Sequence, residues 1–198
     1  VLSWQTGHRE RLYLSPTSVC DGTTAIRGGI PVCFPQFNQR GTLPKHGFAR
    51  NMAWRLLNEQ SQGPEKVFEL SDNAHTQAAW PFKFKAQLKV SLAARSLKVQ
   101  LTVENTGHQT LSFTGALHTY FDVSHIDQVS LHGQAHQSEW DAVSDTHQAC
   151  LGQLTFKTEF DRVYDVAPEK KPTWVLHDGY EQLHIAQSDS WGQSVVWN

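Results

Sequence analysis

Apolar and polar residues alternate with a period of two along much of this chain, a pattern typical of strands that bury one face. In the longest run, over residues 82–92, every second position is apolar, and lysine, glutamine or serine stands between. A break at 93–96 precedes a second alternating run over 97–104, so the two runs predict a β-hairpin. Another strand on the same alternation is predicted to begin at Leu111, with its apolar face formed by Leu111, Phe113, Gly115 and Leu117.

Shorter strands are predicted over 67–70, 129–131 and 195–197, each bounded by Gly, Asp or Asn. No stretch carries an apolar stripe of period 3.6 over three turns, so very little helix is expected. Many short strands without interleaved helices predict an all-β fold, a large antiparallel β-sandwich. No linker or repeat divides the chain, so residues 1–198 are predicted to form one domain. Strand-like sequence runs to both ends ("VLSW" and "SVVWN"), and further strands are therefore expected beyond each terminus.

The composition is that of a folded globular protein, with 39% hydrophobic and 18% charged residues among 198. A net charge of −2 gives no reason to expect nucleic acid or an anionic membrane as a partner. No run approaches the roughly 20 apolar residues that span a bilayer. The three cysteines, Cys20, Cys33 and Cys150, are an odd and widely spaced set, which predicts free thiols and a cytoplasmic protein. Seven tryptophans and eleven histidines suit a carbohydrate site, but they suit a well-packed β-protein equally.

The stretch "TGALHTYFDV", residues 114–123, carries the first candidate for chemistry. If Leu117 faces the core, the alternation places Thr114, Ala116, His118 and Tyr120 on the opposite face. A histidine among small and hydroxylated neighbours has room above it for a ligand. The alternative is a partly exposed sheet histidine that hydrogen-bonds a neighbour, which is the commoner case for a lone histidine.

Two irregular segments carry basic residues. In "LPKHGFARN" (43–51), Lys45, His46 and Arg50 lie on a turn that Pro44 and Gly47 make rigid, which suits a phosphate or a polyhydroxyl ligand. The alternative is a basic surface loop. In "IRGGIPVCFPQF" (26–37), two glycines and two prolines interrupt any regular element, although the segment is too apolar for a solvated loop. We expect its glycines to let the backbone pass close to a ligand and its prolines and phenylalanines to fix Arg27.

A third stretch, "EFDRVY" (159–164), sets Asp161 and Arg162 between apolar positions. An ion pair at a strand edge explains this pair without function, and Glu159, Asp165 and Glu169 are alternative carboxylates. No metal is expected, because the histidines do not fall at zinc-ligand spacings with the cysteines. Motifs of serine hydrolases, of P-loop nucleotide binding and of dinucleotide binding are absent from the sequence.

The blocks "AIRGGIPVCFPQF", "LPKHGFARN", "ALHTYFDV", "DRVY" and "VVWN", in this order, resemble the aldose 1-epimerase superfamily, and more narrowly its hexose-6-phosphate branch. The resemblance covers essentially the whole chain. It implies a large antiparallel β-sandwich of the galactose-mutarotase type, with the site in an open groove on one sheet. It also implies an isomerase without a cofactor, which interconverts the α and β anomers of a sugar phosphate by acid–base ring opening.

By the same resemblance, His118 is the general acid, and the general base is a glutamate expected beyond residue 198. Arg27, Lys45, His46, Arg50 and Asp161 match substrate-binding positions. Lys45 departs from the family, where this position is often uncharged. The implied partner is a small-molecule sugar phosphate, bound by a monomer. Two alternatives stay open, a carbohydrate-phosphate binding protein without catalysis and a mutarotase for unphosphorylated sugars.

Overall fold

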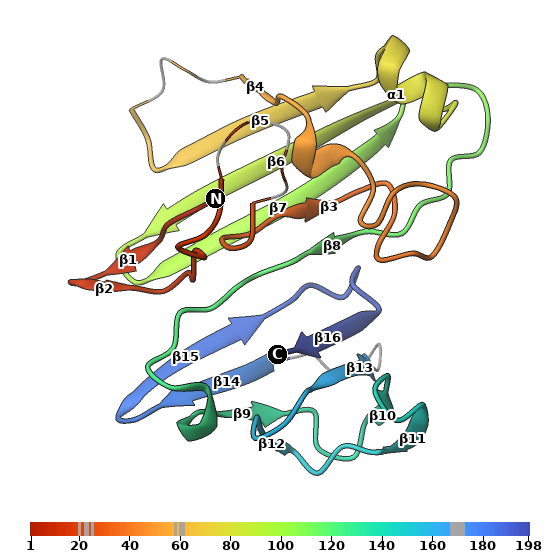
Figure 1. The fold of residues 1–198 in the computed structure, drawn as a ribbon. Coiled ribbons are helices and arrows are strands. Elements are labelled where there is room, and N and C mark those ends of the chain that lie inside the picture. The colour runs from red at the N-terminus through yellow and green to blue at the C-terminus, as the bar shows by residue number, and fades with distance from the viewer. Residues whose placement is uncertain (20, 22–23, 25, 58, 60–61, 167–172) are drawn as a thin grey trace. The chain divides into compact units, whose positions relative to one another are not determined.

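The computed structural model describes residues 1–19, 21, 24, 26–57, 59, 62–166 and 173–198. They form two compact units, Val1–Asp122 (unit 1) and Val123–Asn198 (unit 2). The single domain expected over the whole chain stays a prediction. Unit 1 contains, in chain order, β1 Gln5–Thr6, β2 Arg9–Glu10, β3 Val32–Cys33, η1 Ala49–Asn51, β4 Arg55–Leu56, β5 Glu65–Ser71, α1 Ala74–Ala79, β6 Phe84–Ala93, β7 Ser96–Asn105 and β8 Ala116–Leu117 (Figure 1).

The main sheet of unit 1 has the order β4-β5-β6-β7, and every pairing in it is antiparallel. Its longest ladder is the predicted hairpin, in which β6 pairs with β7 from Phe84↔Asn105 to Ala93↔Ser96. The burial of β6 follows the sequence alternation, because Phe84, Ala86 and Leu88 are buried while the residues between them are partly exposed. The hairpin prediction is therefore confirmed.

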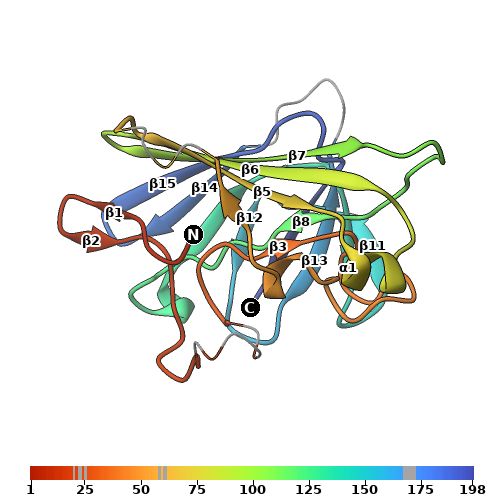
Figure 2. The same cartoon turned by 90° about the horizontal axis from the view of Figure 1, so that it is seen from above.

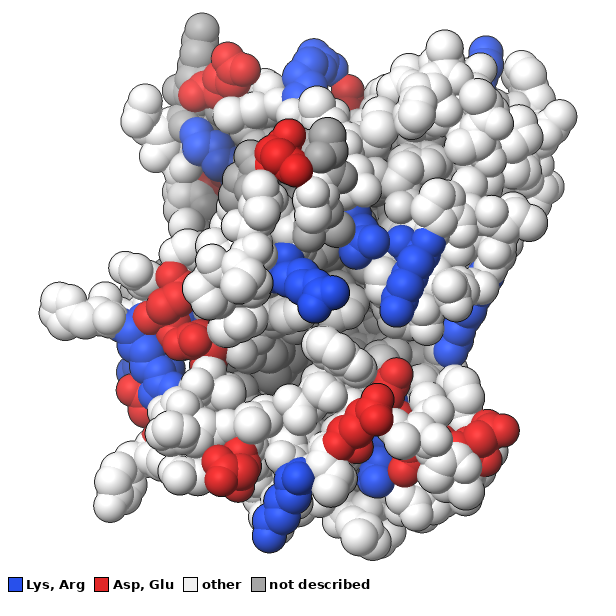
Figure 3. All heavy atoms as spheres, in the orientation of Figure 1, with Lys and Arg blue, Asp and Glu red and all other residues white. Residues whose placement is uncertain are grey.

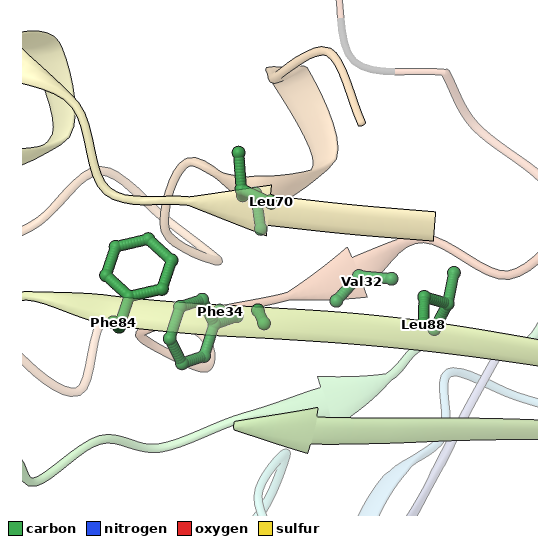
Figure 4. Close-up of a cluster of buried hydrophobic side chains, with 7 residues drawn as sticks. Val32, Phe34, Leu70, Phe84 and Leu88 are labelled. Carbon is green, nitrogen blue, oxygen red and sulfur yellow. The ribbon is translucent and has the colours of Figure 1, made fainter. Parts of the chain in front are cut away.

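The core of unit 1 lies between this sheet and the irregular chain around β3 and η1, which runs along one side of β5 and β6 (Figure 2). Val32, Phe34, Leu70, Phe84 and Leu88 come together there (Figure 4). The ring of Phe34 is fully buried and meets the ring of Phe84 edge-on, with 5.2 Å between centroids. Burial of a phenylalanine stabilises a fold by about 1.5–3 kcal/mol. An apolar anchor therefore holds the segment that carries Arg27, as the sequence predicted for Phe34.

The strand predicted from Leu111 is mostly wrong, since only Ala116–Leu117 (β8) is a strand there. The segment pairs with the chain around β3, through hydrogen bonds from Thr114 N to Pro35 O and from His118 N to Pro31 O. Proline has no backbone N–H, so neither Pro31 nor Pro35 can donate a hydrogen bond back to the opposite segment. A ladder that one side cannot complete stays short and irregular.

Gly28 and Gly29 approach the chain's own backbone, and not open space. Both have positive φ, 137° and 66°. A Cβ on Gly28 would lie 2.5 Å from the carbonyl oxygen of Tyr13, and one on Gly29 would lie 2.2 Å from that of Val1. The glycines therefore let segment 28–30 pack against residues 1–2 and 13–14. The expectation that they also let the backbone pass close to a ligand stays a prediction.

Unit 2 contains, in chain order, η2 Ile126–Gln128, β9 Ser130–Gly133, β10 Ser138–Asp141, β11 Thr146–Ala149, β12 Gln153–Thr155, β13 Asp161–Asp165, β14 Thr173–Asp178, β15 Glu181–Ala186 and β16 Gln193–Trp197. Its strands form two antiparallel sheets, with strand orders β11-β10-β13-β16 and β12-β9-β14-β15. Strands at 130–133 and 193–197 lie close to the shorter ones predicted from alternation. Its buried side chains include Leu131, Phe160, Tyr164 and Trp174.

Helix is as scarce as the sequence predicted. The six-residue α1, Ala74–Ala79, is capped by Asn73, whose side chain accepts hydrogen bonds from the backbone N–H groups of His75 and Thr76. In the described part of the chain, no helix has the length and apolar character needed to cross a membrane. Cys33 and Cys150 are buried free thiols, as predicted, and Cys20 lies outside the described residues.

Candidate active site

His118 lies directly after β8 in unit 1, with its imidazole between two other rings. Its backbone N–H donates to Pro31 O at 3.0 Å, which ties it to the irregular segment. The ring of Tyr120 stacks on its imidazole, with 4.8 Å between centroids and an interplanar angle of 19°. The imidazole of His46 meets it at 88°, with 5.5 Å between centroids. The structure thus confirms the prediction that His118 and Tyr120 share a face, and it adds His46.

His46 is buried on a turn in which it adopts a left-handed backbone conformation, with φ of 70°. Its Nδ1 accepts a hydrogen bond from the Asn38 backbone N–H at 3.1 Å, and its own N–H donates to Asn38 O at 3.0 Å. Gly47 follows with φ of 67°, and a Cβ there would lie 2.3 Å from Phe34 O. The sequence therefore needs glycine at 47 to bring His46 onto the segment around β3.

Gln36 closes the loop that precedes His46. Its buried amide donates through Nε2 to Asn38 O and Leu43 O, both at 3.0 Å, and its Oε1 accepts from Leu43 N. Three hydrogen bonds from one buried side chain fix the path of 36–43. The loop is consequently an organised structure, and its function as a ligand-binding turn stays a prediction beside the alternative of a basic surface loop.

The imidazole of His46 is electrically neutral at physiological pH. Burial lowers its pKa from 6.5 to about 4, and the positive charges of Arg50, His118 and Lys45 act in the same direction. Because Nδ1 accepts from a backbone N–H, the proton of the neutral ring is on Nε2. His46 therefore offers one N–H donor and adds no positive charge beside His118.

This low pKa predicts a loss of stability in acid. Above about pH 6.5 neither the folded nor the unfolded chain protonates His46, so its contribution to stability is complete. As the pH falls from 6.5 towards 4, only the unfolded chain takes up the proton, and the folded state is progressively destabilised. We expect the Tm to fall over this range, and to fall less in His46→Asn, whose Oδ1 can replace Nδ1 as the acceptor.

The matched control for that experiment is His75→Asn, since His75 is exposed on α1. Thermal melts of the three proteins between pH 7.5 and 4.5 give the comparison. Equal losses of Tm in His46→Asn and in the parent protein would show that His46 is not the group that titrates.

Arg27, Lys45 and Arg50 make the surroundings of the two histidines basic. The charges of Arg27 and Arg50 both act on Tyr120, whose pKa burial raises, and those of Arg50 and Lys45 act on His46. Arg50 Nη2 donates to Lys45 O at 3.0 Å, while its buried Nε bonds to none of the described residues. Basic side chains also gather over the irregular segments of unit 1 in the space-filling view (Figure 3). The cluster has the charge and donors that an anionic ligand requires.

Arg27 reaches this cluster from a firmly held backbone. Its N–H donates to Ser18 Oγ and its carbonyl accepts from the same hydroxyl, both at 3.1 Å, and from Ser15 N at 2.9 Å. Its side chain is exposed. Cys33, by contrast, is buried, and burial raises the pKa of its thiol to about 11, so it is an inert part of the packing.

Asp161, the remaining predicted site residue, belongs to unit 2. It is the first residue of β13, where it pairs with Trp197 of β16, and its carbonyl accepts from Ala142 N at 2.9 Å. Its neighbour Arg162 forms ion pairs with the buried Glu139 (2.8 Å) and with Asp141 (3.1 Å), both on β10. Arg162 therefore ties β13 to β10, so a structural role explains this arginine.

The structure brings together five of the six predicted site residues, namely Arg27, Lys45, His46, Arg50 and His118, all in unit 1. Sequence reasoning missed the partners of His46, which are Asn38 and the ring of Phe37 at 5.3 Å. One signal was available, because asparagine tolerates the left-handed conformation that Asn38 adopts, with φ of 52°. In the described residues no three histidine, cysteine, aspartate or glutamate side chains are grouped so that they could hold a metal ion.

Comparison with known proteins places this chain in a family. The family model for aldose 1-epimerase matches residues 1–198. A protein of Escherichia coli K12 named "Putative glucose-6-phosphate 1-epimerase" is 38% identical over an aligned length of 172 residues, and the match covers 83% of this chain and 56% of the relative. The chain spans 56% to 64% of the length of the first three curated relatives it matches.

Solved structures agree with the sequence comparison. YeaD of Salmonella typhimurium, described as a "putative mutarotase", superimposes with a TM-score of 0.76 at 33% identity, over 89% of this chain and 59% of YeaD. Slr1438 of Synechocystis superimposes with a TM-score of 0.87 at 26% identity, over 100% of this chain and 72% of Slr1438. These matches confirm the antiparallel β-sandwich predicted from the alternation. The chain belongs to the aldose 1-epimerase family.

Proposed function

We propose that this chain carries the general acid and the phosphate-binding residues of an enzyme that interconverts the α and β anomers of a hexose 6-phosphate. The observation that carries the proposal is an imidazole, that of His118, fixed between two rings inside a cluster of basic side chains. The printed name of the E. coli relative, "Putative glucose-6-phosphate 1-epimerase", agrees with this chemistry. Family membership supports the reaction type, and the basic cluster supports a phosphorylated substrate.

Anomer exchange needs an acid and a base that act on the same sugar. The base removes the proton of the C1 hydroxyl while the acid protonates the ring oxygen, so that the bond between C1 and the ring oxygen breaks and C1 becomes an aldehyde. Rotation about C1–C2 presents the other face of the aldehyde, and the ring closes as the two groups exchange roles. We assign the acid to His118. We assign the base to no residue of this chain.

His46 suits the role of a fixed hydrogen-bond donor to a sugar oxygen. Its neutral ring keeps the proton on Nε2, because Asn38 occupies Nδ1. A charged imidazole in this place would repel a protonated His118, whose ring centre is only 5.5 Å away. The low pKa of His46 therefore leaves His118 as the imidazole that carries the transferable proton.

We assign recognition of the phosphate to Arg27 and Arg50, with Lys45 as an additional positive charge. The forked donors of a guanidinium match phosphate oxygens, and each such charge-assisted bond contributes about 1.5–3 kcal/mol. The unpartnered Nε of Arg50 leaves this guanidinium with donor capacity that the described residues do not use. Asp161, an acceptor when ionised, is proposed to bind sugar hydroxyls.

The test is the rate at which pure α-glucose 6-phosphate reaches anomeric equilibrium, followed by NMR with the full-length gene product. We expect acceleration well above the rate in buffer, and a much smaller effect on glucose at the same concentration. Binding of glucose 6-phosphate without acceleration would favour a carbohydrate-phosphate binding protein. Equal acceleration of both sugars would favour a mutarotase for unphosphorylated sugars.

The proposal requires one partner, a small-molecule sugar phosphate, and it requires no metal and no organic cofactor. We propose a monomer in the cytoplasm, where a reducing environment suits the buried free thiols of Cys33 and Cys150.

A further inference from the structure

Tyr120 and His118 are closer together than their positions in the sequence predict. In an extended strand, side chains two residues apart leave the backbone at Cα atoms about 6.6–6.8 Å apart along the strand. The two rings have centroids 4.8 Å apart and planes only 19° from parallel. The chain tightens at His118, because Thr119 N donates to Leu117 O at 3.1 Å, a hydrogen bond that spans three residues. The stack is therefore a local feature that the backbone builds.

The backbone of Tyr120 is fixed on both sides. Its N–H donates to Gly29 O at 2.9 Å, and its carbonyl accepts from Tyr13 N at 3.0 Å. The next residue, Phe121, forms a β-bridge with Leu12. Two separate segments, around 12–13 and around 29, thus hold Tyr120 in place, so its ring is a firm surface against which His118 rests.

Tyr120 also lies within the basic cluster. Burial raises the pKa of its hydroxyl, while the charges of Arg27 and Arg50 act in the opposite direction. The face of an aromatic ring attracts a cation, by about 0.5–2 kcal/mol. The ring of Tyr120 can therefore stabilise the protonated imidazole of His118, although positive charges surround both residues.

We infer that Tyr120 is a positioning residue, whose ring sets the tilt of the His118 imidazole towards the ring oxygen of the substrate. The inference rests on the proposed function of His118 as the acid. The parallel ring of Tyr120 prevents the imidazole from tilting, and the perpendicular ring of His46 limits its movement within its own plane. Proton transfer needs the two heavy atoms within about 2.6–3.2 Å, so a loosened imidazole transfers its proton slowly.

The experiment compares Tyr120→Phe, which keeps the ring and loses the hydroxyl, with Tyr120→Leu, which loses the ring. In the full-length gene product we expect Tyr120→Leu to lower kcat for glucose 6-phosphate about 10- to 100-fold, while KM changes less than about threefold. Tyr120→Phe should retain kcat within about threefold. Tyr180→Leu is the matched control, because Tyr180 is fully exposed in unit 2.

Two results would overturn the inference. One is an unchanged kcat in Tyr120→Leu, and the other is an equal loss in the Phe and Leu variants, which would assign the effect to the hydroxyl. Circular dichroism and melting show whether each variant folds. If Tyr120→Leu does not fold, Tyr120→Met replaces it as the variant without the aromatic ring and is compared with Tyr120→Phe. The expected results stay the same, a lowered kcat without the ring and a retained kcat with it.

A second readout does not depend on activity. A stacked aromatic ring shifts the NMR signals of the His118 ring protons upfield. We expect this shift in the parent protein and in Tyr120→Phe, and its loss in Tyr120→Leu. If the parent protein does not accelerate anomer exchange, the proposed function fails, and the NMR shifts still decide whether Tyr120 positions His118. Signals that are the same in all three proteins would contradict the stack itself.

Discussion

Replacing His118 with alanine is expected to lower kcat for the anomer exchange of glucose 6-phosphate by about 10²- to 10⁴-fold, the range typical for the loss of a general acid. The reason is that the ring oxygen would leave C1 without a proton, as an alkoxide. KM should change little, because the groups assigned to the phosphate, Arg27 and Arg50, remain. The rate is measured by polarimetry or NMR from a single anomer.

The effect should be specific to this histidine. His118 is only partly buried, and its backbone hydrogen bond to Pro31 O does not involve the side chain, so the variant should fold. His108→Ala is a matched control in an exposed turn of the same unit, and it should retain the parent rate. Equal rates for His118→Ala and the parent protein would refute the assignment of the acid.

Replacing Arg27 with alanine is expected to raise KM for glucose 6-phosphate about 10- to 100-fold and to leave KM for glucose nearly unchanged. Loss of one charge-assisted hydrogen bond accounts for about 1.5–3 kcal/mol, which corresponds to a change of this size. The hydrogen bonds of residue 27 to Ser15 and Ser18 use its main chain, which alanine keeps. The variant should therefore melt close to the parent protein.

The matched control is Arg95→Ala, which removes an exposed arginine from the turn between β6 and β7. It separates a specific contact with the phosphate from a general loss of positive charge. A similar rise in KM for both sugars in Arg27→Ala would assign Arg27 to the sugar and not to the phosphate. An unchanged KM for both would remove Arg27 from the site.

The alternation of apolar and polar residues was sufficient to predict the structure where two strands form a regular antiparallel ladder. The alternation over 82–92 and 97–104 identified the hairpin of β6 and β7, because each strand buries one face and exposes the other. The same rule failed over 111–115. The partner of that segment contains Pro31 and Pro35, and the alternation of one strand carries no information about which residues its partner can offer.

The candidate site, too, was only partly predictable from the sequence. The residue types at 27, 45, 46, 50 and 118 were visible in the sequence as basic or titratable groups on rigid or strand-like segments, and the family resemblance assigned their roles. Their mutual geometry was not visible. The 88° contact of His46 with His118 joins residues 72 positions apart (118 − 46), and it depends on the bridge of Phe34 with Gly47.

The sequence by itself determined the all-β class, the main hairpin, the scarcity of helix and the identity of most candidate site residues. These follow from side-chain alternation and residue chemistry, which are local properties. Only the tertiary structure decided that His46 is neutral, that Gly28 and Gly29 serve backbone packing, and that the ring of Tyr120 stacks on that of His118. Burial, close backbone approach and ring stacking each depend on groups distant in sequence or on local turns, so no pattern of single residues specifies them.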